Sequence, residues 1–130
     1  MRLYFLIACG GALGSVLRFF VSDMILRRFG ESFPWGTLLI NVTGSAAIGY
    51  IATFATSGEA RWLGSAEGRL FLMVGICGGY TTFSAFSLQT LNLIRDGDWL
   101  RAGTYMAASV ILCVAGAGLG HALGAGASAR

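Results

Sequence analysis

Four long apolar segments divide the 130-residue chain, and each is long enough to cross a lipid bilayer as one helix. An α-helix rises about 1.5 Å per residue, so about 20 apolar residues cross a hydrocarbon core about 30 Å thick. Charged and polar connectors separate the segments, which cover residues 3–22, 35–56, 70–94 and 102–123. The sequence therefore predicts an all-α membrane protein whose four transmembrane helices form one domain over residues 1–130.

The distribution of charge excludes several classes of function. Only 12% of the residues are charged, and no aspartate or glutamate falls inside a predicted span. Proton-coupled exporters of cations use an intramembrane carboxylate as a relay, so the pattern argues against a small multidrug-type transporter. The chain also shows no metal-ligand spacing, acid–base pair or nucleophile–histidine arrangement. We therefore expect neither an enzyme nor, with arginines scattered over every connector, a nucleic-acid partner.

The arginines give the chain no preferred orientation in the membrane. Orientation follows the arginine and lysine bias of short loops, and the predicted loops carry four arginines on each side: residues 2, 61, 69 and 130 against residues 27, 28, 95 and 101. A balanced count favours dual topology, with opposite copies paired as an antiparallel homodimer. The alternative is a fixed topology set by another feature, such as an unusual first helix.

The third segment contains an unusual polar interruption, Gly78-Gly79-Tyr80-Thr81-Thr82-Phe83-Ser84-Ala85-Phe86. Non-helical backbone at membrane depth occurs only inside protein or beside a wet cavity, so we expect a helix broken in mid-span beside an ion or substrate site. Thr81 or Thr82 could cap the second half-helix. The alternative is a small-residue packing face. Comparable rows of small residues predict close helix interfaces at 10/14, 45/49 and 116/120/124.

Several polar and aromatic side chains inside the spans are candidates for a site. Thr37 and Asn41, like Tyr105 and Ser109, are four residues apart and share a helix face, so they could line a polar track. Asn41 could instead bond a neighbouring helix.

Phe83 and Phe86 could be core residues, or their electropositive ring edges could meet an anion. Arg18 lies near the predicted end of the first span, where it either snorkels to the headgroups or attracts anions in a vestibule. His121 is expected at the interface, near the end of the fourth span.

Three blocks of the sequence resemble the Fluc/CrcB family of small fluoride channels. The first is the glycine-rich run from Gly10 to Arg18, and the second is Gly36-Thr37-Leu38 followed by Asn41 and Gly44. The third, from Gly75 to Ser87, is long and specific. The resemblance covers the whole four-span chain, with two departures: Ala85 stands where threonine is usual and Gln89 where glutamate is frequent.

The resemblance implies an antiparallel, dual-topology homodimer in a bacterial-type inner membrane, with two fluoride pores. It implies a passive, selective channel that exports fluoride and so relieves fluoride toxicity; the alternatives are the multidrug-type transporter and a non-conducting membrane subunit. It also implies a structural Na⁺ at the dimer interface, held by the backbone carbonyls of Gly78 and Thr81. Carried over by motif, the pore residues are Phe83, Phe86, Asn41, Ser109, Tyr105, Thr37, Ser84 and Thr82, with Arg18 in the vestibule.

Overall fold

The computed structural model describes residues 1–55, 62 and 64–128, and within them four helical segments are long and apolar enough to cross a membrane. Three are continuous helices: α1 (Arg2–Phe29), α2 (Trp35–Phe54) and α6 (Trp99–Ser128). The other joins α3 (Ala66–Arg69), the π-helical η1 (Leu70–Cys77), α4 (Gly78–Tyr80) and α5 (Phe83–Arg95). The prediction of four membrane-spanning helical segments is confirmed.

The helices extend beyond most of the predicted spans, because helical hydrogen bonding continues where the apolar run stops. The first helix ends at Phe29 and not near residue 22, and Gly30 closes it with a φ of 73°. Asp23, which the sequence assigned to a connector, lies inside α1 and forms a 2.8 Å ion pair with Arg27. Arg18 therefore lies in the interior of α1, and its predicted place near a helix end was wrong. The predicted end of the second span, Thr56, lies outside the described residues.

Two extended residues, Thr81 and Thr82, separate α4 from α5. Thr81 has φ and ψ of −81° and 157°, and Thr82 has −153° and 114°. The Thr82 side chain accepts a 3.2 Å hydrogen bond from the Ala85 N–H, so the expected capping role belongs to Thr82. Gly78 and Gly79, the first two residues of the polar stretch, are helical. Gly79 serves close packing, since an added Cβ would lie 2.9 Å from the Gly11 Cα.

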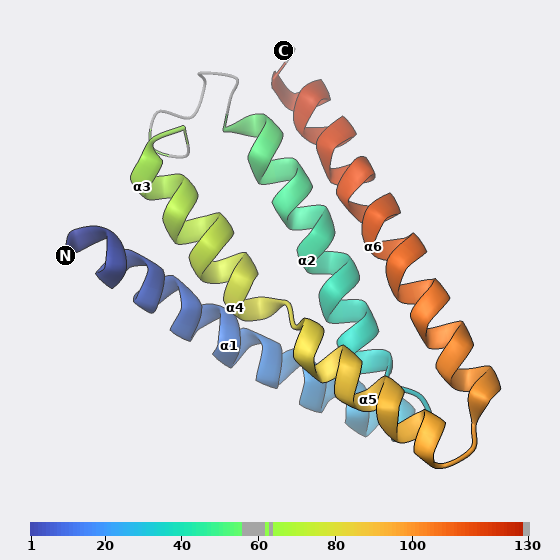
Figure 1. The fold of residues 1–130 in the computed structure, drawn as a ribbon. Helices are drawn as coiled ribbons and strands as arrows, with labels where there is room; N and C mark the ends of the chain where they lie inside the picture. Colours follow the sequence, from blue (N-terminus) through green and yellow to red (C-terminus); the bar gives the residue numbers. More distant parts are fainter. Residues whose placement is uncertain (56–61, 63, 129–130) are drawn as a thin grey trace.

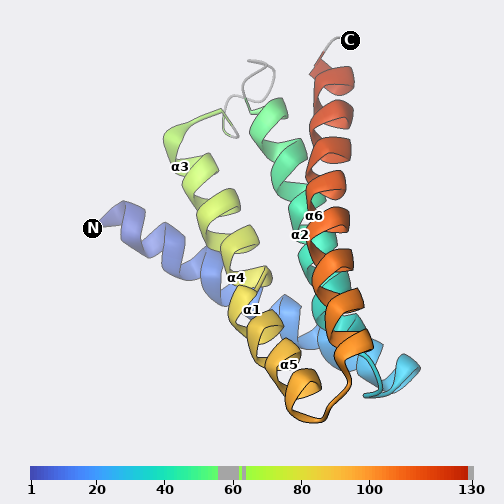
Figure 2. The ribbon, with the colours of Figure 1, turned by 45° about the vertical axis from the view of Figure 1, so that its right-hand side comes forward.

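The small-residue rows are used for packing within one chain. Figures 1 and 2 show α6 lying alongside α2, and the row at 116/120/124 faces the α2 backbone. A Cβ on Gly120 would collide with the Ala46 carbonyl group, and one on Gly124 would lie 2.9 Å from the Tyr50 oxygen. On the other side of the molecule, a Cβ on Gly10 would lie 2.6 Å from the Phe71 carbonyl oxygen. These contacts fix α6 on α2 and α1 on η1 and α4.

One polar contact ties the far ends of α2 and α6. The His121 ring nitrogen Nδ1 lies 2.7 Å from the Thr53 hydroxyl, which also donates to the Gly49 carbonyl. Which of the two atoms donates depends on the tautomer of the His121 ring. His121 therefore has a defined structural role near the end of the fourth segment.

Candidate functional site

The Asn41 side chain bridges α2 to the interruption between α4 and α5. Its Nδ2 donates to the Thr82 carbonyl at 3.1 Å, and its Oδ1 accepts from the Thr82 N–H at 2.8 Å. Both backbone polar groups of Thr82 are thereby satisfied by one side chain, in a region where unpaired backbone groups are costly. We call this pair of bonds the Asn41–Thr82 clamp. One N–H of the Asn41 amide is not used by the clamp.

The clamp and the cap redirect two backbone donors away from their helical acceptors. In a continuous α-helix the Thr82 N–H would bond the Gly78 carbonyl, and the Ala85 N–H would bond the Thr81 carbonyl. Here the Thr82 N–H bonds Asn41 and the Ala85 N–H bonds the Thr82 hydroxyl. The carbonyls of Gly78 and Thr81 therefore lose their usual α-helical donors. The neighbouring Cys77 carbonyl differs, since it accepts from both the N–H and the hydroxyl of Thr81.

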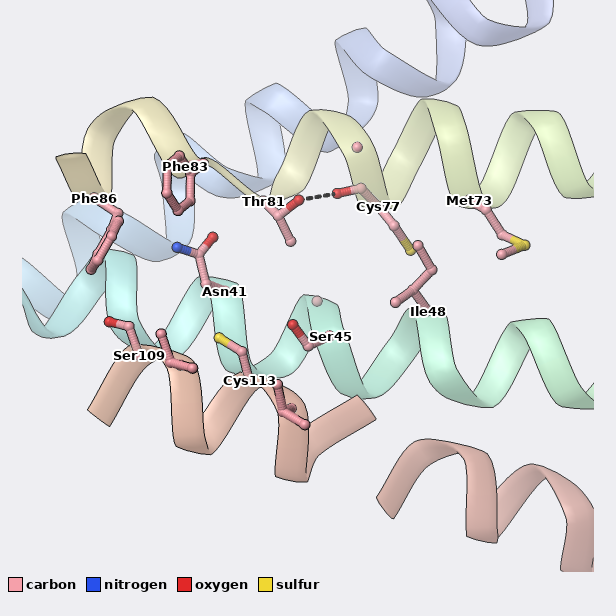
Figure 3. A pocket seen from close by; sticks show the side chains of 14 residues that line it. Asn41, Ser45, Ile48, Met73, Cys77, Thr81, Phe83, Phe86, Ser109 and Cys113 are labelled. Carbon is pink, nitrogen blue, oxygen red and sulfur yellow. Dashed lines mark hydrogen bonds between the residues drawn. The ribbon is translucent and has the colours of Figure 1, made fainter. Parts of the chain in front are cut away.

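A cavity of about 440 Å³ lies beside the interruption, between the third segment, α2 and α6. Figure 3 shows Phe83, Phe86, Asn41 and Ser109 gathered at one end of it, with Cys77 and Met73 toward the other. We call it the aromatic cavity. Its lining residues are Asn41, Gly44, Ser45, Ile48, Met73, Cys77, Gly78, Thr81, Phe83, Phe86, Ser109, Val110, Cys113 and Val114.

The aromatic rings of this region form a connected row. The ring centroids of Phe83 and Phe86 are 5.2 Å apart and tilted by 46°. Phe86 lies 5.1 Å from the Tyr105 ring, and Tyr105 is fully buried. The Tyr105 hydroxyl donates to the Gln89 side-chain oxygen at 2.9 Å. Gln89 thus holds the tyrosine whose ring supports Phe86, a role that the sequence analysis did not assign to it.

Two hydrogen-bond donors in the aromatic cavity are available to a guest. The Ser109 hydroxyl is buried and, among the described residues, has no hydrogen-bond partner. A buried hydroxyl without a partner is costly, so its presence favours a site at which a ligand completes the bond. The second donor is the Asn41 N–H that the clamp leaves free. Both donors lie in the cavity that Phe83 and Phe86 also line.

A second cavity, of about 350 Å³, lies near the clamp and contains Arg18. We call it the arginine cavity. The Arg18 Nε is buried and has no hydrogen-bond partner in the described part of the chain. The lining includes Ser15, Ser22, Thr37, Thr82, Ala85 and Gln89, which come from α1, α2, α5 and the interruption. Since Asn41 lines the first cavity and Thr82 the second, the clamp joins a wall of one cavity to a wall of the other.

A third cavity, of about 340 Å³, leads from the arginine cavity toward one end of the bundle. It shares Ser22, Thr37 and Gln89 with the arginine cavity and adds the exposed carboxylates Glu31 and Asp96 at its outer end. We call it the entrance cavity. Among the described residues, the three cavities place hydroxyls, amides and one arginine along the third segment, and no carboxylate lines the two inner ones.

Comparisons with known proteins agree with this architecture. Residues 5–121 match the family model described as CrcB-like protein, Camphor Resistance (CrcB). The chain belongs to the CrcB-like family. A relative from Opitutus terrae, named fluoride-specific ion channel FluC, is 57% identical over 93% of this chain and 91% of its own length. Proteins of the same name from Paramagnetospirillum magneticum and Rhodospirillum rubrum are 54% and 51% identical over 93% and 91% of this chain. Those alignments cover 94% and 91% of the two relatives.

The CrcB-like chain brings its predicted site residues into two groups and leaves two apart. Asn41, Phe83, Phe86, Ser109, Gly78 and Thr81 share the aromatic cavity, whereas Arg18, Thr37 and Thr82 share the arginine cavity. The two residues of each predicted pair, Thr37 with Asn41 and Tyr105 with Ser109, therefore do not line the same cavity. Tyr105 is packed beneath Phe86, and Ser84 is exposed, with its hydroxyl 3.2 Å from that of Thr82.

Sequence reasoning missed three sulfur-containing residues of the CrcB-like chain. Met73, Cys77 and Cys113 all line the aromatic cavity. The two cysteines are 36 positions apart in sequence and come from different helices, so no local spacing could have predicted that they line the same cavity. Ala85, which stands where threonine is usual, lines the arginine cavity, where a threonine hydroxyl would add a donor.

Proposed function

We propose that this chain conducts fluoride passively and selectively across the membrane, and that fluoride export is its role in resistance to the ion. The observation that carries the proposal is the aromatic cavity, where an unpartnered buried Ser109 hydroxyl and a free Asn41 N–H lie beside Phe83 and Phe86. The names of the relatives, all fluoride-specific ion channels, support the same function.

This donor set suits a small anion that accepts strong hydrogen bonds. An anion entering a narrow protein site loses water, and the site must replace those bonds. Ser109 and Asn41 donate hydrogen bonds, and the phenylalanine ring edges carry positive partial charge. No fixed positive charge in the described part of the chain lines the aromatic cavity, so none of these residues holds an ion there by a full opposite charge. Such weak, multiple contacts allow the ion to leave as well as enter.

The arginine cavity is proposed as a vestibule that concentrates anions before the clamp. Arg18 is a permanent positive charge, and its Nε is buried without a partner in the described residues. Thr37, Thr82 and Gln89 add polar groups around it. The interior position of Arg18 in α1 favours this reading over snorkelling, since the residue is more than two helical turns from the end of the helix.

We propose an antiparallel homodimer as the conducting unit. The Phe83 side chain is 78% exposed in the single chain, although it lines the proposed path. A second copy would cover this ring and close the aromatic cavity, and the balanced arginines permit the opposite orientation. In this arrangement the interruption at Thr81 and Thr82 lies near the middle of the membrane and the two copies form two pores.

The backbone carbonyls of Gly78 and Thr81 are proposed to hold a structural Na⁺ at the dimer interface. Both have lost their α-helical donors to the clamp and the cap, and both residues line the cavity that the second copy would cover. Carbonyl oxygens at interrupted helices are suitable ligands for sodium. The ion would supply positive charge that offsets four converging carbonyl dipoles, two from each copy.

We expect replacement of Na⁺ by N-methylglucamine to lower the thermal stability of the dimer. Unchanged stability in strictly sodium-free buffer would contradict this assignment.

A flux assay on purified protein tests the proposed function. Liposomes loaded with fluoride are diluted into fluoride-free buffer, with valinomycin to clamp the potential and an electrode to follow release. We expect fast fluoride loss that requires valinomycin, together with retention of chloride in matched vesicles. Folded protein that releases neither ion would indicate a non-conducting membrane subunit.

For location, we propose the bacterial inner membrane, where a multi-pass protein of this kind would export fluoride from the cell.

A further inference from the structure

An apolar groove with two arginines at its edge lies where the end of α1 meets the start of α2, next to the entrance cavity. It has a volume of about 550 Å³ and is lined by Met24, Ile25, Arg27, Arg28, Phe29 and Leu39. Its residues are not shared with the aromatic, arginine or entrance cavities, apart from Ile25, which also lines the entrance cavity. We call it the α1–α2 groove.

The two arginines of the groove are exposed and have spare donors. Arg27 uses its Nε to bond Asp23, and its side chain is 78% exposed, so its terminal nitrogens remain accessible. Arg28 has no ion pair among the described residues, and its guanidinium carbon lies 6.0 Å from the centroid of the Phe29 ring. Basic residues in the last turn complement the helix dipole. That effect accounts for positive charge at this helix end, but not for the apolar groove beside it.

The apolar side of the groove continues from the arginines into the depth of the membrane. Met24 is one helical turn before Arg28, and Leu39 is one turn inside α2 from Trp35, which places each about 6 Å along its helix from its charged or aromatic neighbour. Tryptophan prefers the headgroup level of a bilayer. Met24, Phe29 and Leu39 are 53%, 60% and 48% exposed. The groove therefore offers cationic groups at headgroup level and apolar surface at the level of the first acyl methylenes.

We propose that the α1–α2 groove binds an anionic phospholipid, with the phosphate on Arg28 and Arg27 and an acyl chain along Met24 and Leu39. Basic pockets beside transmembrane helices bind anionic lipid headgroups, and the planar guanidinium can donate two hydrogen bonds to one phosphate. Free phosphate would meet the arginines but would leave the apolar surface uncovered. The two parts of the groove together thus favour the lipid.

Native mass spectrometry of the detergent-solubilised protein, with equal amounts of phosphatidylglycerol or phosphatidylcholine added, tests this proposal. We expect more phosphatidylglycerol retained per subunit than phosphatidylcholine. A cationic residue near an anionic lipid surface contributes about 1 kcal/mol, which corresponds to about a five-fold change in affinity. Arg28→Gln should therefore lower phosphatidylglycerol retention about five-fold. Inorganic phosphate at millimolar concentration should not displace the lipid.

Two matched variants distinguish the groove from general surface effects. Arg95→Gln removes the same charge from the same end of the bundle but outside the groove, and it should leave retention unchanged. Leu39→Gln makes the groove surface polar and should lower retention, whereas Leu88→Gln, at a similarly exposed leucine of α5, should not. Circular dichroism confirms that each variant is folded.

Three results would overturn the proposal. The first is equal retention of the two lipids, and the second is an equal loss in Arg28→Gln and Arg95→Gln. The third is a loss of dimer in Leu39→Gln with lipid retention per subunit unchanged, which would make the groove a contact between copies of this chain. The proposal does not depend on fluoride conduction, so a protein that carries no flux can still confirm or refute it.

Discussion

Replacing Asn41 with aspartate changes one side-chain atom and tests two roles of Asn41: its hydrogen bonds in the clamp and its contact with the ion. The substituted oxygen would stand where the amide nitrogen now donates to the Thr82 carbonyl at 3.1 Å, while the acceptor for the Thr82 N–H at 2.8 Å is kept. Loss of the donor removes one hydrogen bond from the part-buried Thr82 carbonyl, at a cost of about 0.5–1.5 kcal/mol. The fold should survive this loss, because the glycine-mediated packing of α1 and α6 is untouched.

The new charge should have a larger effect on the ion than on the fold. Two like charges about 4 Å apart repel by about 4 kcal/mol at an effective dielectric constant of about 20. Each 1.36 kcal/mol corresponds to a factor of ten in rate, so fluoride passage in Asn41→Asp should slow by about three orders of magnitude. The liposome efflux assay with valinomycin measures this directly.

Two controls identify the cause of the loss. Asn92→Asp introduces the same charge at an exposed asparagine on the entrance cavity, where water limits the repulsion to about 1 kcal/mol and the loss to about five-fold. Asn41→Ala removes the clamp without adding charge. Flux within ten-fold of the wild type in folded Asn41→Asp would refute the reasoning. Equal losses in Asn41→Asp and Asn41→Ala would show that the clamp, and not the charge, limits conduction.

Three further substitutions test other parts of the structure. Phe83→Ile should abolish fluoride flux and leave the helix content unchanged, because the ring is 78% exposed in the single chain and its loss leaves no void within that chain; retained flux would remove this ring from the path. Ser109→Ala should slow flux about ten-fold or more, since a hydrogen bond to a charged group contributes about 1.5–3 kcal/mol, and an unchanged rate in the same assay would argue that its hydroxyl never meets the ion. Gly120→Val should destabilise the fold by about 1–3 kcal/mol through contact with the Ala46 carbonyl. Gly118→Val, which meets nothing within 4 Å, is the control, and equal thermal midpoints for the two would contradict the packing described for α6.

The sequence predicts the helices of this protein better than it predicts their ends and contacts. Apolar runs of about 20 residues suffice to identify four membrane-spanning segments, because every backbone group in lipid must be satisfied within the helix. They do not reveal that α1 continues to Phe29, since helical bonding extends past the apolar core into the headgroup region. The capping role of Thr82 is also predictable, because it depends on residues only three positions apart.

The arrangement of the candidate site depends on contacts that local patterns do not encode. Asn41 was expected either to bond another helix or to meet an anion, and its amide has enough donors for both. Which backbone group it bonds depends on how α2 lies against the interruption 41 residues later. Thr37 shares a helix face with Asn41 but lines a different cavity, and the clamp joins a wall of one cavity to a wall of the other. The same holds for Gln89, whose tyrosine partner is on another helix.

The Asn41–Thr82 clamp means that the shape of the third segment is not a property of its own sequence. Without α2, the Thr82 N–H would be free to bond the Gly78 carbonyl, as it does in a continuous α-helix. In a synthetic peptide of residues 66–95 in a bilayer, the Gly78 carbonyl should therefore regain its helical donor, whereas the Thr82 cap, which lies within the peptide, can still hold the Ala85 N–H away from the Thr81 carbonyl. A transfer of this motif to another scaffold must therefore include an asparagine on a neighbouring helix that bonds the Thr82 backbone.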